Sequence, residues 1–199
     1  MRTVKVVESV DIQAPLEEVF DIILNIERRL QLSPLWGNSE IDPPSPDYPN
    51  AGSSYHVRVV RGEPSEYDAI VSEYVPHRKF AYTLTSPRVE AAAWIVQEVT
   101  QGTRLLYEEQ FRVEEERAEE MMTEVRRVVH QWLTNMKQYA ELRDGRARRL
   151  LRWVLDHWVL KLRAEQRRVI VMLLALQVIM FITFVMAAAG FGIMRLIIR

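Results

Sequence analysis

The feature that most constrains this chain is an uncharged, apolar run near its C-terminal end, from Val169 to Met194. None of its 26 residues is Asp, Glu, Lys, Arg or His. As a helix rising 1.5 Å per residue, the run would span about 39 Å, more than the hydrocarbon core of a bilayer at about 30 Å. A buried core helix rarely runs so long without a polar face. We therefore expect residues 169–194 to form one transmembrane helix, followed by a short tail, residues 195–199.

The basic residues around this run predict its orientation. Nine Lys and Arg residues lie between positions 143 and 168, whereas only Arg195 and Arg199 follow the run. The positive-inside rule places the more basic side in the cytoplasm. We therefore expect a tail-anchored, single-pass membrane protein whose N-terminal domain is cytoplasmic. The small residues Ala188 and Gly192 would let the helix pack closely against a helix of another membrane subunit.

The segment 143–168 has the pattern of a basic amphipathic juxtamembrane helix. Its apolar residues recur at helical spacing between basic ones, as in helices that lie on anionic lipid. Packing against the folded domain or against a partner protein is an equal alternative. Nucleic-acid binding is not expected, because the arginines adjoin a membrane span. The residues expected at the membrane surface are Arg148, Arg149, Arg152, Trp153, Trp158 and Lys161.

Charge separates the N-terminal part of the chain from this tail. Residues 1–142 carry 15 Lys and Arg against 24 Asp and Glu, whereas residues 143–199 carry 11 against 3. Such a split indicates two different environments. The chain has no cysteine, which excludes disulfides, thiolate metal sites and a cysteine nucleophile. It has no P-loop or glycine-rich dinucleotide loop, and its four histidines lack metal-ligand spacing, so we expect neither a cofactor nor a metal.

Alternation of apolar and polar residues predicts a series of strands within residues 1–142. The first covers residues 3–12, and Pro15 then opens a helical stretch that Ser33-Pro34 breaks. Residues 42–54 have the composition of a loop. Short turns between the later strands indicate an antiparallel meander, which a long helix over 118–142 follows. The later strands are expected over residues 54–61, 66–75, 79–86, 89–100 and 103–113.

The opening residues carry a family resemblance. The sequence from Val10 to Phe20, which includes Ala14-Pro15, is similar to the opening strand and helix of polyketide cyclase-like proteins. With the order of elements, residues 4–142 resemble the START-like superfamily, also called SRPBCC. The resemblance implies an α+β helix-grip fold, in which a curved antiparallel sheet wraps around a long C-terminal helix with an apolar cavity between them. It also implies binding of lipids, sterols, polyketides or quinones, and only some members are enzymes.

The strand registers predict which side chains would line this cavity. Glu8, Gln97 and Glu109 each interrupt an apolar face, and their strands are neighbours in the resembled fold. There they would orient a ligand hydroxyl or carbonyl, or act as acid and base with raised pKa values. A register slip would instead place them in solvent, and periodicity does not distinguish a lined cavity from a filled core. The other expected lining residues are Trp36, Tyr55, Val57, Tyr82, Tyr107, Met121, Val125, Val129 and Trp132.

These patterns favour a membrane-anchored, non-enzymatic module that binds a hydrophobic small molecule, such as a lipid, an isoprenoid or a quinone-like compound. A domain held at the bilayer meets such a ligand at high effective concentration. Two alternatives stay open. The first is an accessory subunit of a membrane protein complex, bound through its transmembrane helix. The second is an enzyme of the cyclase or dehydratase type that uses Glu8 or Glu109.

Overall fold

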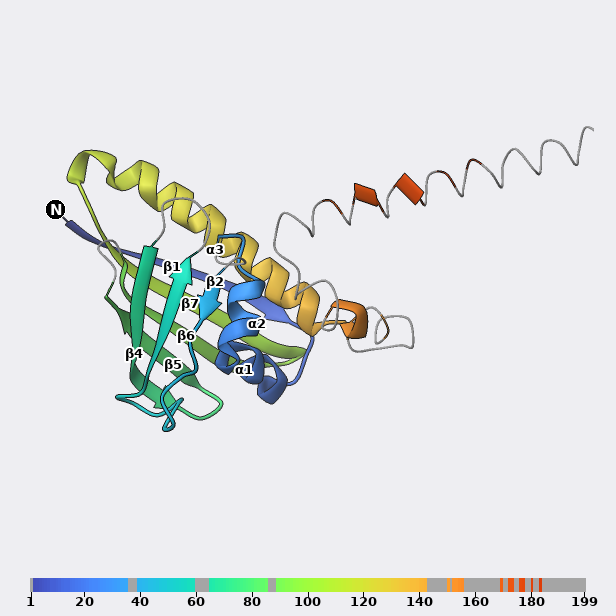
Figure 1. The fold of residues 1–199 in the computed structure, drawn as a ribbon, viewed down its shortest axis with the longest axis horizontal. Coiled ribbons are helices and arrows are strands. Elements are labelled where there is room, and N and C mark those ends of the chain that lie inside the picture. Colours follow the sequence, from blue (N-terminus) through green and yellow to red (C-terminus); the bar gives the residue numbers. More distant parts are fainter. Residues whose placement is uncertain are drawn as a thin grey trace, which may run out of the picture. The chain divides into compact units, whose positions relative to one another are not determined.

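The computed structural model describes residues 2–35, 39–59, 65–85, 89–142, 150 and 152–155, and separate positions between 169 and 183. The chain divides into two compact units, 1–156 and 157–199. In the first unit, seven strands, three α-helices and one 3-10 helix are described (Figure 1). In chain order these are β1 (Arg2–Ile12), α1 (Leu16–Leu24), α2 (Ile26–Gln31), β2 (Ser39–Ile41), β3 (Ser54–Val59), β4 (Ser65–Val75), β5 (Lys79–Leu84), β6 (Val89–Val99), β7 (Gly102–Val113), η1 (Glu115–Arg117) and α3 (Ala118–Ala140).

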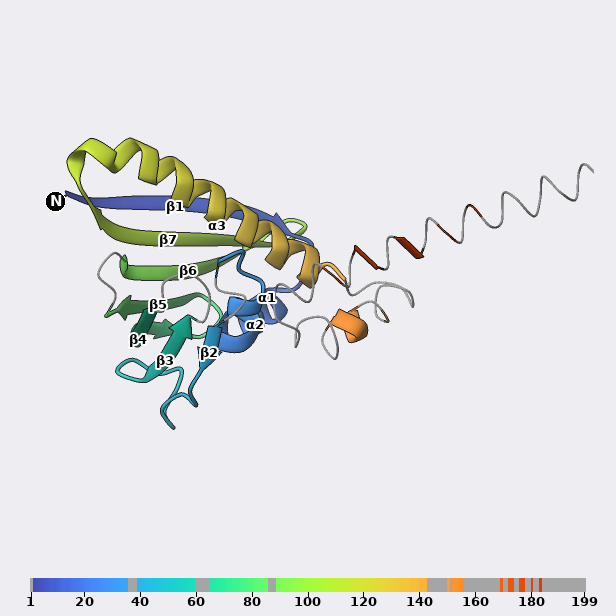
Figure 2. The same ribbon diagram turned by 45° about the horizontal axis from the view of Figure 1, so that its top comes forward.

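All seven strands join one antiparallel sheet with the order β1-β7-β6-β5-β4-β3-β2. Strands β2 to β7 follow one another as a meander, and the first strand of the chain, β1, pairs with the last of them, β7. The sheet curves, and α3 runs along its β1 and β7 side (Figure 2). The expected curved sheet with a long C-terminal helix is therefore confirmed. The short strand β2 was not predicted.

The local sequence explains the elements that begin and end around α1 and α2. Four apolar residues of α1 are buried, and they recur on one side of the helix. Asn25 ends α1 and caps α2, because its side chain accepts a hydrogen bond from the Arg28 backbone N–H at 2.9 Å. At the β6–β7 turn, Gly102 has a φ of +130°, and a Cβ there would lie 2.2 Å from the Ile12 carbonyl oxygen. Only glycine fits this close approach.

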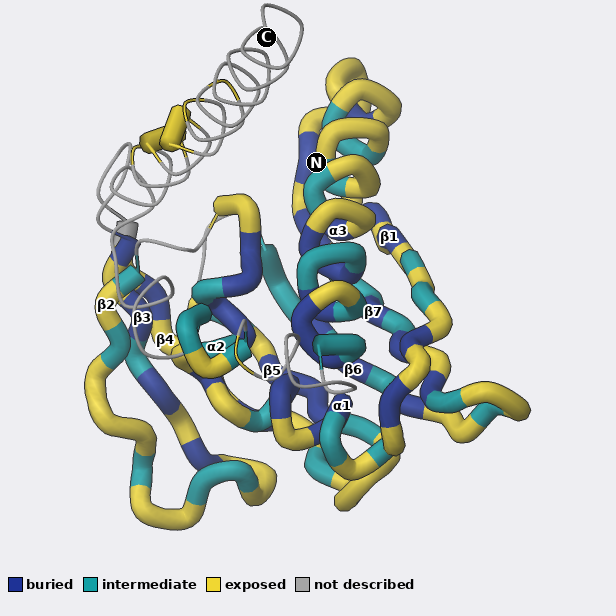
Figure 3. Tube along the Cα trace, turned by 90° about the vertical axis from the view of Figure 1, so that its right-hand side faces the viewer, coloured by how far each residue is buried: buried dark blue, intermediate teal, exposed yellow. Residues whose placement is uncertain are grey.

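The core lies between the concave face of the sheet and one face of α3, as the buried segments in Figure 3 show. Two side chains of α3 also fasten α2 to it. Trp132 Nε1 donates to the Arg29 carbonyl and Asn135 Nδ2 donates to the Leu32 carbonyl, both at 2.9 Å. The helix pair thereby closes one end of the space that the sheet and α3 enclose.

The segment after α3 packs on the folded domain where it is described. The Arg152 guanidinium pairs with the Glu18 carboxylate and lies 4.9 Å from the centre of the Tyr139 ring. Arg28 covers the same ring at 4.9 Å and donates a hydrogen bond to its hydroxyl. Arg152 is half-buried, whereas the neighbouring Trp153 is exposed. The sequence allowed this segment to lie on lipid or to pack on the folded domain. The contacts of Arg152 fit packing on the domain.

In the second unit, the described positions are helical and their large apolar side chains are exposed. These side chains are Val169, Met172, Leu173, Leu176 and Met180. Within the described residues, no helix is both long enough and apolar enough to cross a membrane. Most of the expected span 169–194 lies outside the described residues, as do Arg148, Arg149, Trp158 and Lys161.

Candidate functional site

Aromatic side chains cover the concave face of the sheet below α3. Trp94 of β6 lies 4.3 Å from Tyr107 of β7 and 5.0 Å from Trp132 of α3, measured between ring centres. On the other side of Trp94, Tyr82 and Phe80 of β5 pack together at 5.6 Å. These rings are buried, so this part of the concave face is a filled aromatic core.

A fully buried arginine lies within the same aromatic layer. The Arg29 guanidinium lies 5.1 to 5.7 Å from the ring centres of Tyr55, Phe80 and Tyr82. It donates hydrogen bonds to the Tyr55 hydroxyl at 2.7 Å and to the Ile23 carbonyl. Within the described residues, no carboxylate pairs with it, and its Nε has no hydrogen-bond partner. Cation–π contacts and neutral acceptors therefore stabilise this buried positive charge.

Sequence reasoning missed Arg29, although the sequence carries a signal for it. Its spacing from Ile22 and Ile26 places it on the apolar side of the helical stretch, where an arginine is unusual. A charged residue at such a position is buried only if other groups stabilise it.

The second charged group on the concave face is Glu109 of β7. Its residue is half-buried and faces inward, in register with the buried residues Val6 of β1 and Ala92 of β6. The Tyr107 hydroxyl donates a hydrogen bond to Glu109 Oε2 at 3.0 Å. Burial raises the pKa of Glu109, and the hydrogen bond from Tyr107 opposes this shift only in part. The direction of this shift is the one expected from the sequence for a carboxyl on this face, and its cause is burial rather than a second carboxylate.

The predicted cluster of three polar residues does not form. Gln97 is exposed and lies opposite Arg104, so it faces away from the core, and its predicted position in the cavity is wrong. The reason is that β6 is apolar on both faces: Ala92, Trp94 and Val96 are buried, whereas residues 91, 93 and 95 are half-buried. Two apolar faces give no period-2 signal for which one is inside.

Glu8 keeps its predicted register but not its predicted partner. Its carboxylate lies 3.1 Å from the Arg126 guanidinium and 4.0 Å from the His130 ring, both on α3. The Arg126 side chain is 63% exposed, so this ion pair lies at the solvent edge between β1 and α3. Glu8 therefore does not join Glu109.

The other predicted lining residues face the core where they are described. Tyr55, Val57, Tyr82, Tyr107, Val129 and Trp132 are buried. Met121 and Val125 are half-buried, and they pack against the apolar cluster around Val6 and Phe111. Trp36 lies outside the described residues. The interior is thus tightly filled beside Trp132 and more accessible beside Glu109 and the first half of α3.

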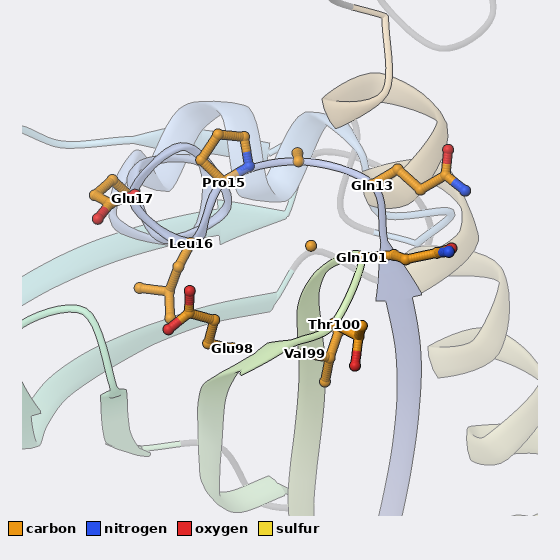
Figure 4. Close-up of a pocket in the computed structure, with 10 residues that line it drawn as sticks. Gln13, Pro15, Leu16, Glu17, Glu98, Val99, Thr100 and Gln101 are labelled. Atoms are coloured by element: carbon orange, nitrogen blue, oxygen red, sulfur yellow. The ribbon is translucent and has the colours of Figure 1, made fainter.

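A surface hollow of about 690 Å³ lies at one end of the sheet (Figure 4). The end of β1, the start of α1 and the β6–β7 turn line it, with the labelled residues Gln13, Pro15, Leu16, Glu17, Glu98, Val99, Thr100 and Gln101. Its two charged residues, Glu17 and Glu98, are both acidic. The hollow lies outside the concave face, and no aromatic wall lines it, so it is not the candidate site.

The curved sheet, the long last helix and the charged groups between them define a helix-grip domain. Residues 3–141 match the family described as "Polyketide cyclase / dehydrase and lipid transport". The chain belongs to this family, and the expected superfamily is confirmed.

Solved structures share the fold at low sequence identity. Protein MLL2253 from Mesorhizobium loti is 16% identical with a TM-score of 0.56, and the match covers 71% of this chain and 100% of that one. Protein CV1439 from Chromobacterium violaceum is 14% identical with a TM-score of 0.54, covering 69% and 97%. The di-domain ARO/CYC StfQ from the steffimycin biosynthetic pathway is 11% identical with a TM-score of 0.57, covering 71% and 51%. No curated protein matches the chain.

Proposed function

We propose that this protein is a membrane-anchored, non-enzymatic module that binds a hydrophobic small molecule between its sheet and α3. The observation that carries the proposal is the half-buried carboxyl of Glu109 on a concave face whose other side chains, apart from Arg29, are mostly apolar or aromatic. Within the described residues, no cation pairs with it. A buried unpaired carboxyl costs stability, and an apolar residue there would serve a purely structural core better. A ligand that forms a hydrogen bond with Glu109 would explain why a carboxyl is present at this position.

The membrane anchor in this proposal rests on the sequence of the tail. The uncharged run favours a single membrane span. The larger number of basic residues on its N-terminal side favours a domain in the cytoplasm. The exposed apolar side chains of the second unit, such as Met172 and Leu176, need a covering of lipid or of another apolar helix. A hydrophobic ligand dissolves in the bilayer, so anchoring brings the domain to its source.

The enzymatic alternative now depends on one carboxyl group. Glu8 is paired with Arg126 at the solvent edge, which leaves Glu109 as the remaining candidate acid. Burial raises the pKa of Tyr107 well above its usual value, and the charge of Glu109 raises it further, so the phenol stays neutral and holds the carboxyl as a donor. A cyclase or dehydratase would have to use Glu109 both to bind and to protonate its substrate.

Native mass spectrometry of the full chain, released from its membrane in mild detergent, tests the proposal. We expect a small apolar molecule to remain bound to the wild type and to be lost from Glu109→Leu. Glu108→Gln is the matched control, because Glu108 lies next in the strand and pairs with Lys5 at 2.8 Å on the other face. Protein subunits without a small molecule would favour the accessory role instead. Chemical conversion of the bound molecule over time would favour the enzyme.

A further inference from the structure

Three polar side chains lie around one alanine of the concave face. Glu109, Ala92 and Tyr82 lie side by side on β7, β6 and β5, since Glu109 pairs with Ala92 and Ala92 pairs with Tyr82. Because alanine is small, the two polar side chains face each other across it. Tyr107 joins them, since its hydroxyl donates a hydrogen bond to Glu109 at 3.0 Å.

One hydrogen-bonding position in this group remains open. Tyr107 donates to Glu109 Oε2, and within the described residues no group bonds to Glu109 Oε1. The carboxyl is accessible in part, although Val6, Ala92 and Tyr107 around it are each at most 3% exposed. A group that bonds to Oε1 would therefore lie against apolar side chains, which favours a ligand with an apolar body.

We propose that Glu109, held by Tyr107, binds the hydroxyl group of an uncharged apolar molecule. This inference rests on the proposed function and names the class of its ligand. A hydroxyl donates one hydrogen bond to Oε1 and needs no counter-charge. A ligand carboxylate would meet the Glu109 carboxyl with no cation to separate the two, because within the described residues no ion pair reaches Glu109 and Arg29 lies against the rings of Tyr55, Phe80 and Tyr82. A ligand ammonium would have to bury a charge and three N–H groups, whereas a hydroxyl buries one O–H group and no charge.

Photolabelling of the full chain in phosphatidylcholine nanodiscs tests this choice. The probes are four twelve-carbon chains that carry a mid-chain diazirine: a primary alcohol, a carboxylic acid, an amine and a plain alkane. Mass spectrometry of the digested protein then measures the label on β6, β7 and α3. At pH 7.5 we expect the alcohol to label these elements about tenfold more than the acid, the amine or the alkane. A tenfold gain in binding is about what one hydrogen bond to a charged group contributes.

Variants of Glu109 separate the hydrogen bond from the apolar wall. Glu109→Leu should lower labelling by the alcohol about tenfold and leave labelling by the alkane unchanged. Glu109→Gln keeps an acceptor oxygen and should retain most of the alcohol labelling, and Glu108→Gln should change nothing. Equal or stronger labelling by the acid or amine, or unchanged alcohol labelling in Glu109→Leu, would overturn the inference. Absence of label from all four probes would instead overturn the proposed function itself.

Discussion

At the scale of single residues, Glu109 should make the stability of the domain depend on pH. In the unfolded chain its carboxyl titrates near 4.5, whereas burial raises its pKa in the folded protein. Between these two values the folded state binds more protons, so the free energy of unfolding falls as pH rises. Glu109→Gln has no titrating carboxyl at this position, so it should not lose this part of the unfolding free energy as pH rises. We expect it to raise the melting temperature by about 3 °C at pH 7.5, or about 1 kcal/mol, and by less at pH 4.5.

Thermal unfolding of the full chain at the two pH values measures this difference. Glu108→Gln is again the control, because Glu108 pairs with Lys5 on the other face and its loss should not stabilise the fold. A Glu109→Gln variant that is less stable than the wild type, by the same amount at both pH values, would contradict the burial of this carboxyl.

Some residue positions could be predicted from the sequence and others could not, for a physical reason. The strands at Tyr55 and Tyr107 have one apolar face, so alternation placed these side chains correctly in the core. The direction of the Glu8 side chain depends on its ion pair with Arg126, which lies far away in the sequence. Period-2 alternation does not reveal such a partner. Arg29 was overlooked because only tertiary packing supplies the rings that stabilise its charge.

At the scale of elements, the β6–β7 hairpin depends on Gly102. Gly102→Ala would place a Cβ 2.2 Å from the Ile12 carbonyl oxygen, which is a backbone atom, in addition to the strain of a φ of +130°. We expect this variant to lose about 3 kcal/mol of unfolding free energy. Gly52→Ala is the matched control, since Gly52 also has a positive φ, +91°, but nothing lies within 4 Å of its Cβ position. It should lose about 1 kcal/mol, and equal losses in a denaturant titration would refute the close approach.

Helices and strands were predictable to different degrees because their sequence signals differ in length. The predicted helix 118–142 is α3, which ends at Ala140; its signal is strong because apolar residues recur on one face over about six turns. The predicted strands agree with β1 and β3 to β7 within a few residues at each end. Strand β2 has three residues, too few to show alternation, and its partner β3 determines it.

The segment after α3 provides a test of how elements dock on the domain. Glu18→Gln removes the carboxylate that pairs with Arg152 and leaves every trypsin site in place. We expect trypsin to cleave between residues 143 and 163 about two- to fivefold faster in this variant, as the loss of a half-exposed ion pair allows. Glu17→Gln, at the neighbouring exposed position, should cleave at the wild-type rate. Equal rates in all three proteins would show that this pair does not hold the segment.

At the scale of the whole molecule, the proposal predicts that the two units differ in their solvent. The uncharged run would be stable in hydrocarbon, because all backbone groups of a helix are bonded within it. The domain, by contrast, carries a net negative charge and has a buried apolar core of its own. We therefore expect the full chain to sediment with membranes and to resist extraction by alkaline carbonate. A chain that ends at Leu142 should be in the soluble fraction and keep the melting transition of the domain.

Protease treatment of intact cells and of inverted membrane vesicles then tests the orientation. Because the basic residues lie on the domain side of the run, the domain should be protected in cells and digested in inverted vesicles. The opposite protection pattern would place the domain outside the cytoplasm. A full chain that stays soluble would refute the anchor, but the labelling of Glu109 variants would still decide whether the domain binds an apolar alcohol. Anchoring and binding are thus separable, because the first depends on the tail and the second on the concave face of the sheet.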